Sequence, residues 1–321
     1  MIVFSDLQQY KEATDGCAVA LGNFDGVHKG HQLLIRSCVE AAEQEGIPSA
    51  VFTFRDHPTN VMMGHSVVKC LMTLDQKVSA VEALGVDYLV VVPFTDEMRN
   101  CSPENFVKDI LVDQLHCRHA FCGFNYSFGH KALGTPKMLR DFGAEYGFSV
   151  TEMPEFDLDG GVVSSTRLRR ILEQGDMEAY TSLAGRAYAI SGKVVRGEQN
   201  GRKMGFPTAN LNIPEGYAVP PRGVYVTRTT IDGAVYASVT NVGTKPTIGL
   251  FTENAETHVL DYSGELYDNF ITVEFVHMIR PERQFESMDA LAEQIRSDCS
   301  VARNFASRPS LTSFENTEKS R

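Results

Sequence analysis

Hydrophobic positions in the first half of the chain alternate between short β-branched runs and longer segments with helical spacing. Capping signals support the helices, because Thr73 and Ser102 precede two of them, Pro103 occupies a first helical position, and Gly46 ends another. The predicted strands are 17–24, 47–54, 86–94, 119–124 and 148–154, and the predicted helices are 30–46, 73–85, 102–115 and 138–147. This alternation predicts a parallel sheet that is covered by helices.

The pattern changes near residue 187, after a helical stretch at 167–185. Strand-like segments then follow one another, with turn signals such as Asp232-Gly233 between them. These strands are predicted at 188–197, 222–231, 234–243, 255–264 and 269–279, and a helix follows at 287–305. Such a run of strands predicts a small antiparallel β-barrel. The fold class is therefore α/β plus β, with domains at 1–184 and 185–308 and a polar tail at 309–321.

Composition narrows the partners that the chain can have. A length of 321 residues suits two domains. The net charge of −11 argues against broad binding to nucleic acid, although a local group of N–H donors can still hold a phosphate. Seven cysteines without a CxxC pair indicate reduced thiols and a cytoplasmic protein. The first residues do not resemble a signal peptide, and no apolar run approaches the roughly 18 residues of a membrane helix.

The string "GNFDGVHKGH" places a glycine-rich turn and two histidines between a predicted strand and a predicted helix. Free N–H groups and the positive end of the helix favour an anion there, and imidazoles at His28 and His31 add donors. The turn lacks the lysine and serine of a P-loop. Zinc is the alternative ligand for two histidines, but a third ligand with suitable spacing is missing nearby.

This string resembles the signature of nucleotidyltransferases with an HxGH motif. The resemblance implies a Rossmann-like domain in which His28 and His31 stabilise the α-phosphate of a nucleotide during attack, while Gly22, Phe24 and Asp25 shape the turn. Imidazoles in that position stabilise charge that develops on a leaving pyrophosphate.

A second string, "VSSTRLRRILEQGD", puts hydroxyls directly before an arginine-rich helix. Helix caps and a solvated basic face are the simplest interpretation of such a string. It also resembles the SSTxxR motif of the same nucleotidyltransferases, which implies that Ser165, Thr166 and Arg169 hold a triphosphate. The segment 122–135 is similar to a nucleotide-binding loop of the flavin-making branch, and this similarity assigns a nucleotide contact to Asn125. In the nearby string "TFRDHPTN", Asp56 stands where that branch usually has proline.

The string "GKVVRGEQNGRKMGFPTANL" contains the candidate metal- and nucleotide-binding residues of the second domain. Thr208 and Asn210 are two residues apart, so they face the same side of an extended backbone. Their hard oxygen atoms suit Mg²⁺ that carries ATP phosphates, whereas a generic glycine-rich hairpin is the structural alternative for the turn. The stretch closely resembles the PTAN motif of riboflavin kinases, which implies that Thr208 and Asn210 bind the metal and that Gly197 and Gly205 lie at the nucleotide.

The same resemblance continues through the end of the second domain. It implies that Glu256, in the string "ETH", is the general base that activates a primary hydroxyl. Spacing alone would not favour Glu256 over Glu253 or Glu265. The resemblance also places a flavin-side loop at Arg280, Pro281 and Glu282. A crowded string at 116–122, "HCRHAFC", has the residue types of a metal site but not the spacing of one.

Both resemblances occur in this order in the family of bacterial bifunctional riboflavin kinases and FMN adenylyltransferases. They imply phosphorylation of riboflavin to FMN, and then adenylylation of FMN to FAD and pyrophosphate, with Mg²⁺ and ATP. The expected partners are these small molecules, not nucleic acid or a membrane. Two alternatives stay open: an active kinase joined to a regulatory flavin-binding module, and a non-catalytic flavin sensor or carrier.

Overall fold

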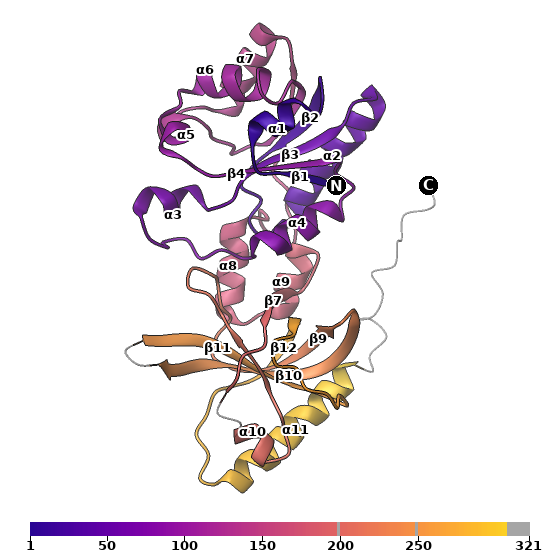
Figure 1. Ribbon diagram of the computed structural model, residues 1–321, viewed down its shortest axis with the longest axis vertical. Coiled ribbons are helices and arrows are strands. Elements are labelled where there is room, and N and C mark those ends of the chain that lie inside the picture. The colour runs from indigo at the N-terminus through magenta and orange to yellow at the C-terminus, as the bar shows by residue number, and fades with distance from the viewer. Residues whose placement is uncertain (198–199, 248–249, 307–321) are drawn as a thin grey trace. The chain divides into compact units, whose positions relative to one another are not determined.

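The structure is a computed structural model, and it describes residues 1–197, 200–247 and 250–306. The chain divides into two compact units. Figure 1 shows the ribbon, with a colour that runs along the chain by residue number. The first unit contains Met1–Arg169, Leu183–Gly185 and Gly216–Ala218, and the described remainder forms the second unit. The polar tail predicted at 309–321 lies outside the described residues.

A six-stranded sheet forms the centre of the first unit, and each of its strand pairs is parallel. Its order is β1-β4-β3-β2-β5-β6. The strands are β1 (Ile2–Phe4), β2 (Cys17–Leu21), β3 (Ser49–Phe54), β4 (Tyr88–Val92), β5 (Cys117–Gly123) and β6 (Ser149–Met153). The prediction of a parallel sheet is therefore confirmed. The edge strand β1 was not predicted, because three residues are too few to give a clear hydrophobic period.

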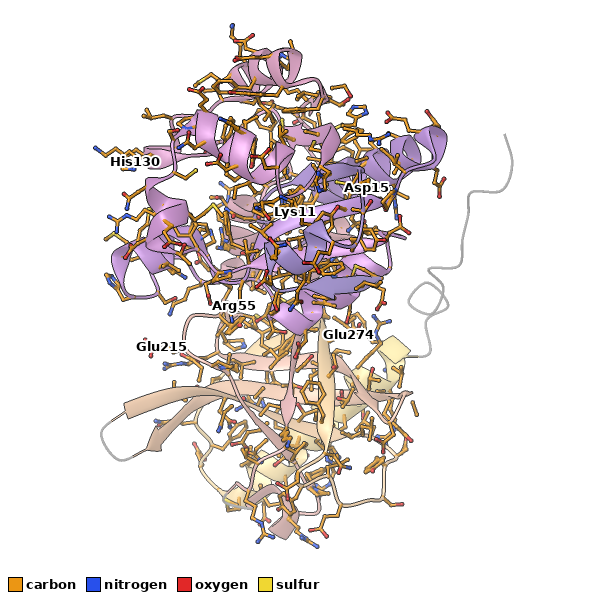
Figure 2. The ribbon with its side chains drawn as sticks, turned by 45° about the horizontal axis from the view of Figure 1, so that its top comes forward. Lys11, Asp15, Arg55, His130, Glu215 and Glu274 are labelled. Carbon is orange, nitrogen blue, oxygen red and sulfur yellow. The ribbon has the colours of Figure 1, made fainter. Side chains whose placement is uncertain are left out.

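Helices cover both faces of this sheet, so the central strands are buried on each side. One face packs against α2 (Lys29–Glu45) and α4 (Leu74–Glu82), and the other against α1 (Leu7–Lys11), η1 (Phe106–Val112) and α7 (Pro136–Tyr146). Shorter helical segments are α3 (Pro58–Met63), α5 (Asp96–Asn100), α6 (Pro103–Asn105) and η2 (His130–Ala132). Charged side chains such as Asp15 and Arg55, both labelled in Figure 2, are exposed.

The predicted caps are confirmed, but two predicted helices differ from the observed ones. Gly46 ends α2 in a left-handed conformation, and Thr73 begins α4 with a complete capping box. The helix predicted at 102–115 starts at the Ser102 cap and then widens into the π-helix η1. The helix predicted at 167–185 is two helices, α8 (Ser165–Gln174) and α9 (Met177–Ala184), because Gly175 adopts a φ of +76° between them.

The second unit is a six-stranded antiparallel sheet that curls toward a barrel, with the order β7-β12-β9-β10-β11-β8. A bridge between Val195 and Asn210 joins the region after β7 to β8 at the other edge, and it brings the sheet close to closure. The strands are β7 (Tyr188–Lys193), β8 (Ala209–Asn212), β9 (Gly223–Ile231), β10 (Ala234–Thr247), β11 (Leu250–Val259) and β12 (Phe270–Pro281). A short helix, α10 (Asn200–Lys203), precedes β8, and the long helix α11 (Met288–Ala306) packs on β9 and β10. The predicted barrel and terminal helix are confirmed.

Hydroxyl groups replace hydrocarbon in part of the core of this second unit. Five fully buried hydroxyl side chains form one chain of hydrogen bonds across three strands. Each hydrogen bond is 2.8 Å long between its oxygen atoms. In order they are Thr229, Ser238, Thr227, Thr240 and Thr257. A slip by one residue in the strand register would turn these groups to the wrong face, so the chain of hydroxyls helps to fix the register of β9, β10 and β11.

The Thr240→Val substitution should locally destabilise the barrel by about 1–3 kcal/mol, because Thr227 and Thr257 each lose a hydrogen-bond partner in a dry environment. Native-state hydrogen exchange of the amides in β10 and β11 would measure this loss. Thr240→Ser keeps the hydroxyl and serves as the control. Equal protection in the wild type and the valine variant would contradict the importance of this network.

Candidate functional sites

The two histidines of the first unit are brought together by the start of α2. His28 is the N-cap of this helix, and its Nδ1 accepts a hydrogen bond of 3.2 Å from the backbone N–H of His31. Since Nδ1 is an acceptor there, the proton of a neutral His28 ring lies on Nε2. The two rings stack with centroids 3.6 Å apart, and Phe24 meets His31 edge-on. The helix start thus presents imidazole and backbone donors in one place.

The turn before α2 has an unusual backbone conformation. Phe24, Gly26 and Val27 have φ angles of +48°, +79° and +32°. A positive φ is unfavourable for the bulky Phe24 and for the β-branched Val27, so surrounding contacts must hold the turn in place. Gly26 is also required sterically, because a Cβ atom there would lie 2.8 Å from Leu71 Cδ1.

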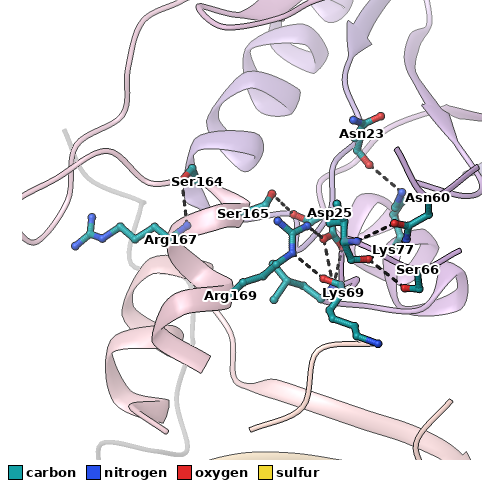
Figure 3. Close-up of polar contacts among 12 residues, drawn as sticks. Asn23, Asp25, Asn60, Ser66, Lys69, Lys77, Ser164, Ser165, Arg167 and Arg169 are labelled. Carbon is teal, nitrogen blue, oxygen red and sulfur yellow. Dashed lines mark hydrogen bonds and ion pairs between the residues drawn. The ribbon is translucent and has the colours of Figure 1, made fainter. Parts of the chain in front are cut away.

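The SST string supplies some of these holding contacts (Figure 3). Ser165 Oγ donates a hydrogen bond of 2.7 Å to the carbonyl oxygen of Asp25, and Arg169 Nη2 lies 2.5 Å from Asp25 Oδ2. Arg169 Nε also donates to the carbonyl oxygen of Lys69 at 2.7 Å. The Asp25 carboxylate accepts the backbone N–H of Leu71 as well. The histidine turn and the SST string, which the sequence predicts as two separate phosphate-binding elements, are therefore joined by a hydrogen bond and an ion pair.

A cavity of about 690 Å³ opens beside this turn, within the range typical of ligand sites. All nine residues that the sequence assigned to the first site line it: Gly22, Phe24, Asp25, His28, His31, Asn125, Ser165, Thr166 and Arg169. They come from segments more than 140 residues apart in the chain. The structure thus gathers the predicted residues around one space, which is large enough for more than a phosphate.

Sequence analysis missed the aromatic wall of this cavity. Phe54 and Phe94 pack edge-on with ring centroids 5.0 Å apart, and Phe106 contacts Phe128 at 5.4 Å. Tyr126 stacks against Phe128 at 5.7 Å. A useful signal was present in the sequence, because Phe54 and Phe94 both stand at the carboxyl ends of predicted strands, which meet at one edge of a parallel sheet. An aromatic wall beside a turn that presents imidazole and backbone N–H donors suits a planar ring system that carries a phosphate.

His57 also lies at this cavity, in the string where Asp56 departs from the usual proline. Its Nδ1 atom is buried and has no hydrogen-bond partner in the part of the chain that the structure describes. Burial lowers the pKa of His57, and the positive charges of Arg169 and Lys77 lower it further, while Asp25 acts in the opposite direction. The lowered pKa favours the neutral form of the ring.

A smaller pocket of about 270 Å³ lies in the second unit, and Gly197, Thr208 and Asn210 line it. Asn210 Nδ2 lies 3.3 Å from the carbonyl oxygen of Thr208. A Cβ atom at Gly197 would lie only 2.7 Å from Asn210 Nδ2, so the glycine makes room for this amide. Gly205 has a φ of +87°, which glycine adopts without strain, but it lies outside the lining of this pocket.

Glu256 lies on β11, where it is directly opposite Asn210 of β8 and Asn241 of β10. Directly opposed residues of an antiparallel pair share a face, so these three side chains belong to the same side of the sheet. Asn254 shares this face because it is two residues away on the same strand, and its Nδ2 donates a hydrogen bond of 3.2 Å to Glu256 Oε1. Asn254 is only 2% exposed, and no sequence pattern singles it out.

The three residues predicted for a flavin-side loop have different surroundings. Arg280 makes a two-pronged ion pair with the buried Asp298 of α11, with Nη2 and Nε at 2.9 and 3.1 Å from Oδ2. Pro281 ends β12 opposite Gly223. Glu282 approaches β10, because a Cβ atom at Gly243 would lie 3.1 Å from its Oε1. Glu282 thus lies close to Gly243, which is two residues from Asn241 on the same strand.

Comparison with known proteins identifies both units. A family model for FAD synthetase matches residues 10–167, and one for riboflavin kinase matches residues 184–306. Together with the two folds and their sites, these matches define a flavin-handling transferase of two parts. Bifunctional riboflavin kinase/FMN adenylyltransferases from Haemophilus influenzae and Bacillus subtilis are 34% and 37% identical to it, over 95% and 90% of this chain and 99% and 92% of theirs. The chain therefore belongs to the family of bifunctional riboflavin kinase/FMN adenylyltransferases.

A crystal structure described as a macrolide-efflux protein from Streptococcus pneumoniae has the same fold, with a TM-score of 0.85 and 26% identity. The match covers 94% of this chain and 98% of the other. Among the described residues of the present chain, we find no helix with the length and apolar character needed to cross a membrane.

Proposed function

We propose that this chain converts riboflavin to FAD in two ATP-dependent steps, one in each unit. The observation that carries the proposal is the gathering of nine predicted residues around one cavity that also has an aromatic wall. Such a cavity suits a flavin ring next to a polyphosphate. The membership of the family supports the same pair of reactions. Free thiols at all seven cysteines fit a reducing compartment such as the cytoplasm.

In the second unit, the proposed step is transfer of the γ-phosphate of ATP to the 5′-hydroxyl of riboflavin. Glu256 takes the proton of this hydroxyl, the hydroxyl oxygen forms a bond to the γ-phosphorus, and the bond to ADP breaks. Asn254 holds one oxygen of the Glu256 carboxylate, which fixes the direction in which the base acts. FMN and ADP leave.

The oxygen atoms of Thr208 and Asn210 fit Mg²⁺ that arrives with ATP, because two neutral ligands leave most coordination positions to phosphate oxygens and water. Such an ion would neutralise charge on the transferred phosphate. Within the described residues, no group of three or more acidic, histidine or cysteine side chains forms a separate metal site. The role of this chain is to position the Asn210 amide, for which Gly197 supplies the space.

Gly197→Ala should lower kcat/KM for MgATP in riboflavin phosphorylation by about 10- to 100-fold, because the new Cβ atom displaces the Asn210 amide. Initial rates at several Mg²⁺ concentrations would measure the effect. Gly192→Ala is a matched control, since its Cβ atom would meet Leu211 at an ordinary 3.8 Å. Equal kcat/KM values for both variants would contradict the proposed position of the metal.

In the first unit, the proposed step is transfer of the adenylyl group of a second ATP to FMN. An oxygen of the FMN phosphate attacks the α-phosphorus, and the bond to the β-phosphate breaks to release pyrophosphate. His28 Nε2–H and the His31 ring donate to the phosphate oxygens on which charge develops. Asn125 and Thr166 lie on the same cavity and supply further polar groups. The FMN phosphate is already a nucleophile, so the step needs no covalent intermediate with the protein.

One product assay tests both steps. Wild-type protein is incubated with riboflavin, ATP and Mg²⁺, and FMN, FAD and pyrophosphate are followed with time. FMN should form first and FAD should follow with one pyrophosphate for each FAD. FMN without FAD, also when FMN is supplied, would favour a kinase joined to a regulatory module. Flavin binding without either product would favour a sensor or carrier.

A further inference from the structure

A buried lysine lies behind the histidine turn, outside every string that sequence analysis selected. Lys77 is a residue of α4 and is only 8% exposed. Its Nζ donates hydrogen bonds to the carbonyl oxygens of Asn23 at 2.8 Å and of Phe54 at 3.4 Å. Figure 3 shows the contact with Asn23. A cation is rarely buried unless its partners compensate for lost hydration.

The two carbonyl groups that Lys77 contacts occupy matching places in neighbouring strands. Asn23 follows the end of β2 and leads into the turn, and Phe54 is the last residue of β3. Thr53 Oγ1 donates a second hydrogen bond to the Asn23 carbonyl at 3.1 Å. One ammonium group therefore joins the carboxyl ends of two parallel strands at the point where the strained turn begins. This connection restricts the position of the first residue of the turn, and it thereby restricts the position of His28.

The charges around the turn do not cancel. Among the buried groups, Asp25 (6% exposed) contributes one negative charge, while the side chain of Arg169 (17% exposed) and Lys77 contribute two positive charges. Burial lowers the pKa of Lys77, while Asp25 and the exposed Asp56 act in the opposite direction and favour its charged form. The field of these groups reaches the cavity wall at His57, where burial lowers the pKa and Arg169 and Lys77 lower it further against the opposing effect of Asp25. An electropositive wall is notable in a chain whose net charge is −11. Buried charges are weakly screened, so this positive potential favours a polyphosphate in the cavity.

We propose that Lys77 is a positioning residue for adenylyl transfer. It holds the histidine turn in place, and it supplies positive charge near the phosphates, as a lysine does in a P-loop. Lys77 is absent from the residues that line the cavity, so it acts through the Asn23 carbonyl and through its field. The inference rests on the proposed adenylyl transfer in the first unit.

The test compares Lys77→Met, which removes charge and donors, with Lys77→Arg, which keeps both. In Lys77→Met, kcat for adenylylation of supplied FMN should fall by about 10- to 100-fold with little change in KM for FMN. The affinity for inorganic pyrophosphate, measured by calorimetry, should fall by about 10-fold. Lys77→Arg should recover most of both losses. Phosphorylation of riboflavin by the same variants reports on the second unit and should keep its wild-type rate.

Further variants separate charge from folding. Lys137→Met removes an exposed lysine from the same unit and should leave both measurements unchanged. If Lys77→Met does not fold, Lys77→Gln replaces it, because glutamine keeps a donor and loses the charge. A folded Met or Gln variant with wild-type kcat and pyrophosphate affinity would overturn the proposal. Absence of FAD formation by the wild type would instead reject the underlying function, so the two failures are distinguishable.

Discussion

Glu256→Gln is expected to lower kcat for riboflavin phosphorylation by about 10²- to 10⁴-fold, the range of general-base catalysis. Glutamine has nearly the same shape as glutamate and still accepts a hydrogen bond from Asn254, but it cannot take a proton from the riboflavin hydroxyl. The KM for ATP should change little, because Glu256 lies outside the lining of the Thr208–Asn210 pocket. Initial rates of FMN formation at saturating riboflavin would measure the loss.

The other unit supplies the control for this variant. Adenylylation of supplied FMN should proceed at the wild-type rate, since its proposed residues all belong to the first unit. Glu253→Gln and Glu265→Gln test the two carboxylates that spacing alone leaves as alternatives, and both variants should stay active. Substantial kinase activity in Glu256→Gln, together with loss in either of the other two, would move the general base to that residue.

His31→Ala and His28→Asn should each lower kcat for FAD formation by about 10²- to 10³-fold, the cost of removing a donor to developing charge. The choice of asparagine at position 28 follows from the structure. His28 is also the N-cap of α2, and alanine there would cost the helix about 1 kcal/mol in addition to the imidazole. Asparagine is a good N-cap, so its oxygen can still accept the His31 N–H while the second ring nitrogen is lost. Pyrophosphate release with supplied FMN would measure the effect.

Riboflavin phosphorylation should be unchanged in both histidine variants. Loss of the kinase step in a folded His28→Asn or His31→Ala protein would contradict the separation of the two reactions into two units. Equal activity of His28→Asn and the wild type would show that the cap, rather than the imidazole, is the contribution of His28.

The sequence predicted the fold class well because both patterns are strong. Buried parallel strands are continuous apolar runs, and most of the helices carry recognisable caps at residues such as Thr73 and Gly46. The π-helix η1 was not predicted, since it differs from an α-helix by the way that packing widens the turn rather than by its hydrophobic period. The break at Gly175 could have been recognised from the glycine itself.

The candidate sites were predicted where a contiguous string marks them and missed where tertiary contacts create them. "GNFDGVHKGH" and "GFPTAN" are local, and most of their residues line the two cavities. Lys77 lies in an ordinary amphipathic helix, and its burial depends on carbonyl groups of two strands that are distant in the sequence. The importance of Asn254 depends on its hydrogen bond to Glu256, two positions later in the chain. The SSTxxR resemblance predicts that Arg169 holds phosphate, whereas its ion pair with Asp25 depends on a contact across 144 residues.

The bonds between the histidine turn and the SST string affect the order in which the first unit matures during synthesis. All six strands of its sheet are complete once Met153 has been added, so the core can form on the nascent chain. The contacts of Asp25 with Ser165 and Arg169 span 140 and 144 residues, and they require the chain to be made up to the start of α8. The turn remains without these contacts until then. A nascent chain therefore acquires its sheet before the contacts that hold the histidine turn, and the proposed adenylyl-transfer site is among the last features of this unit to form.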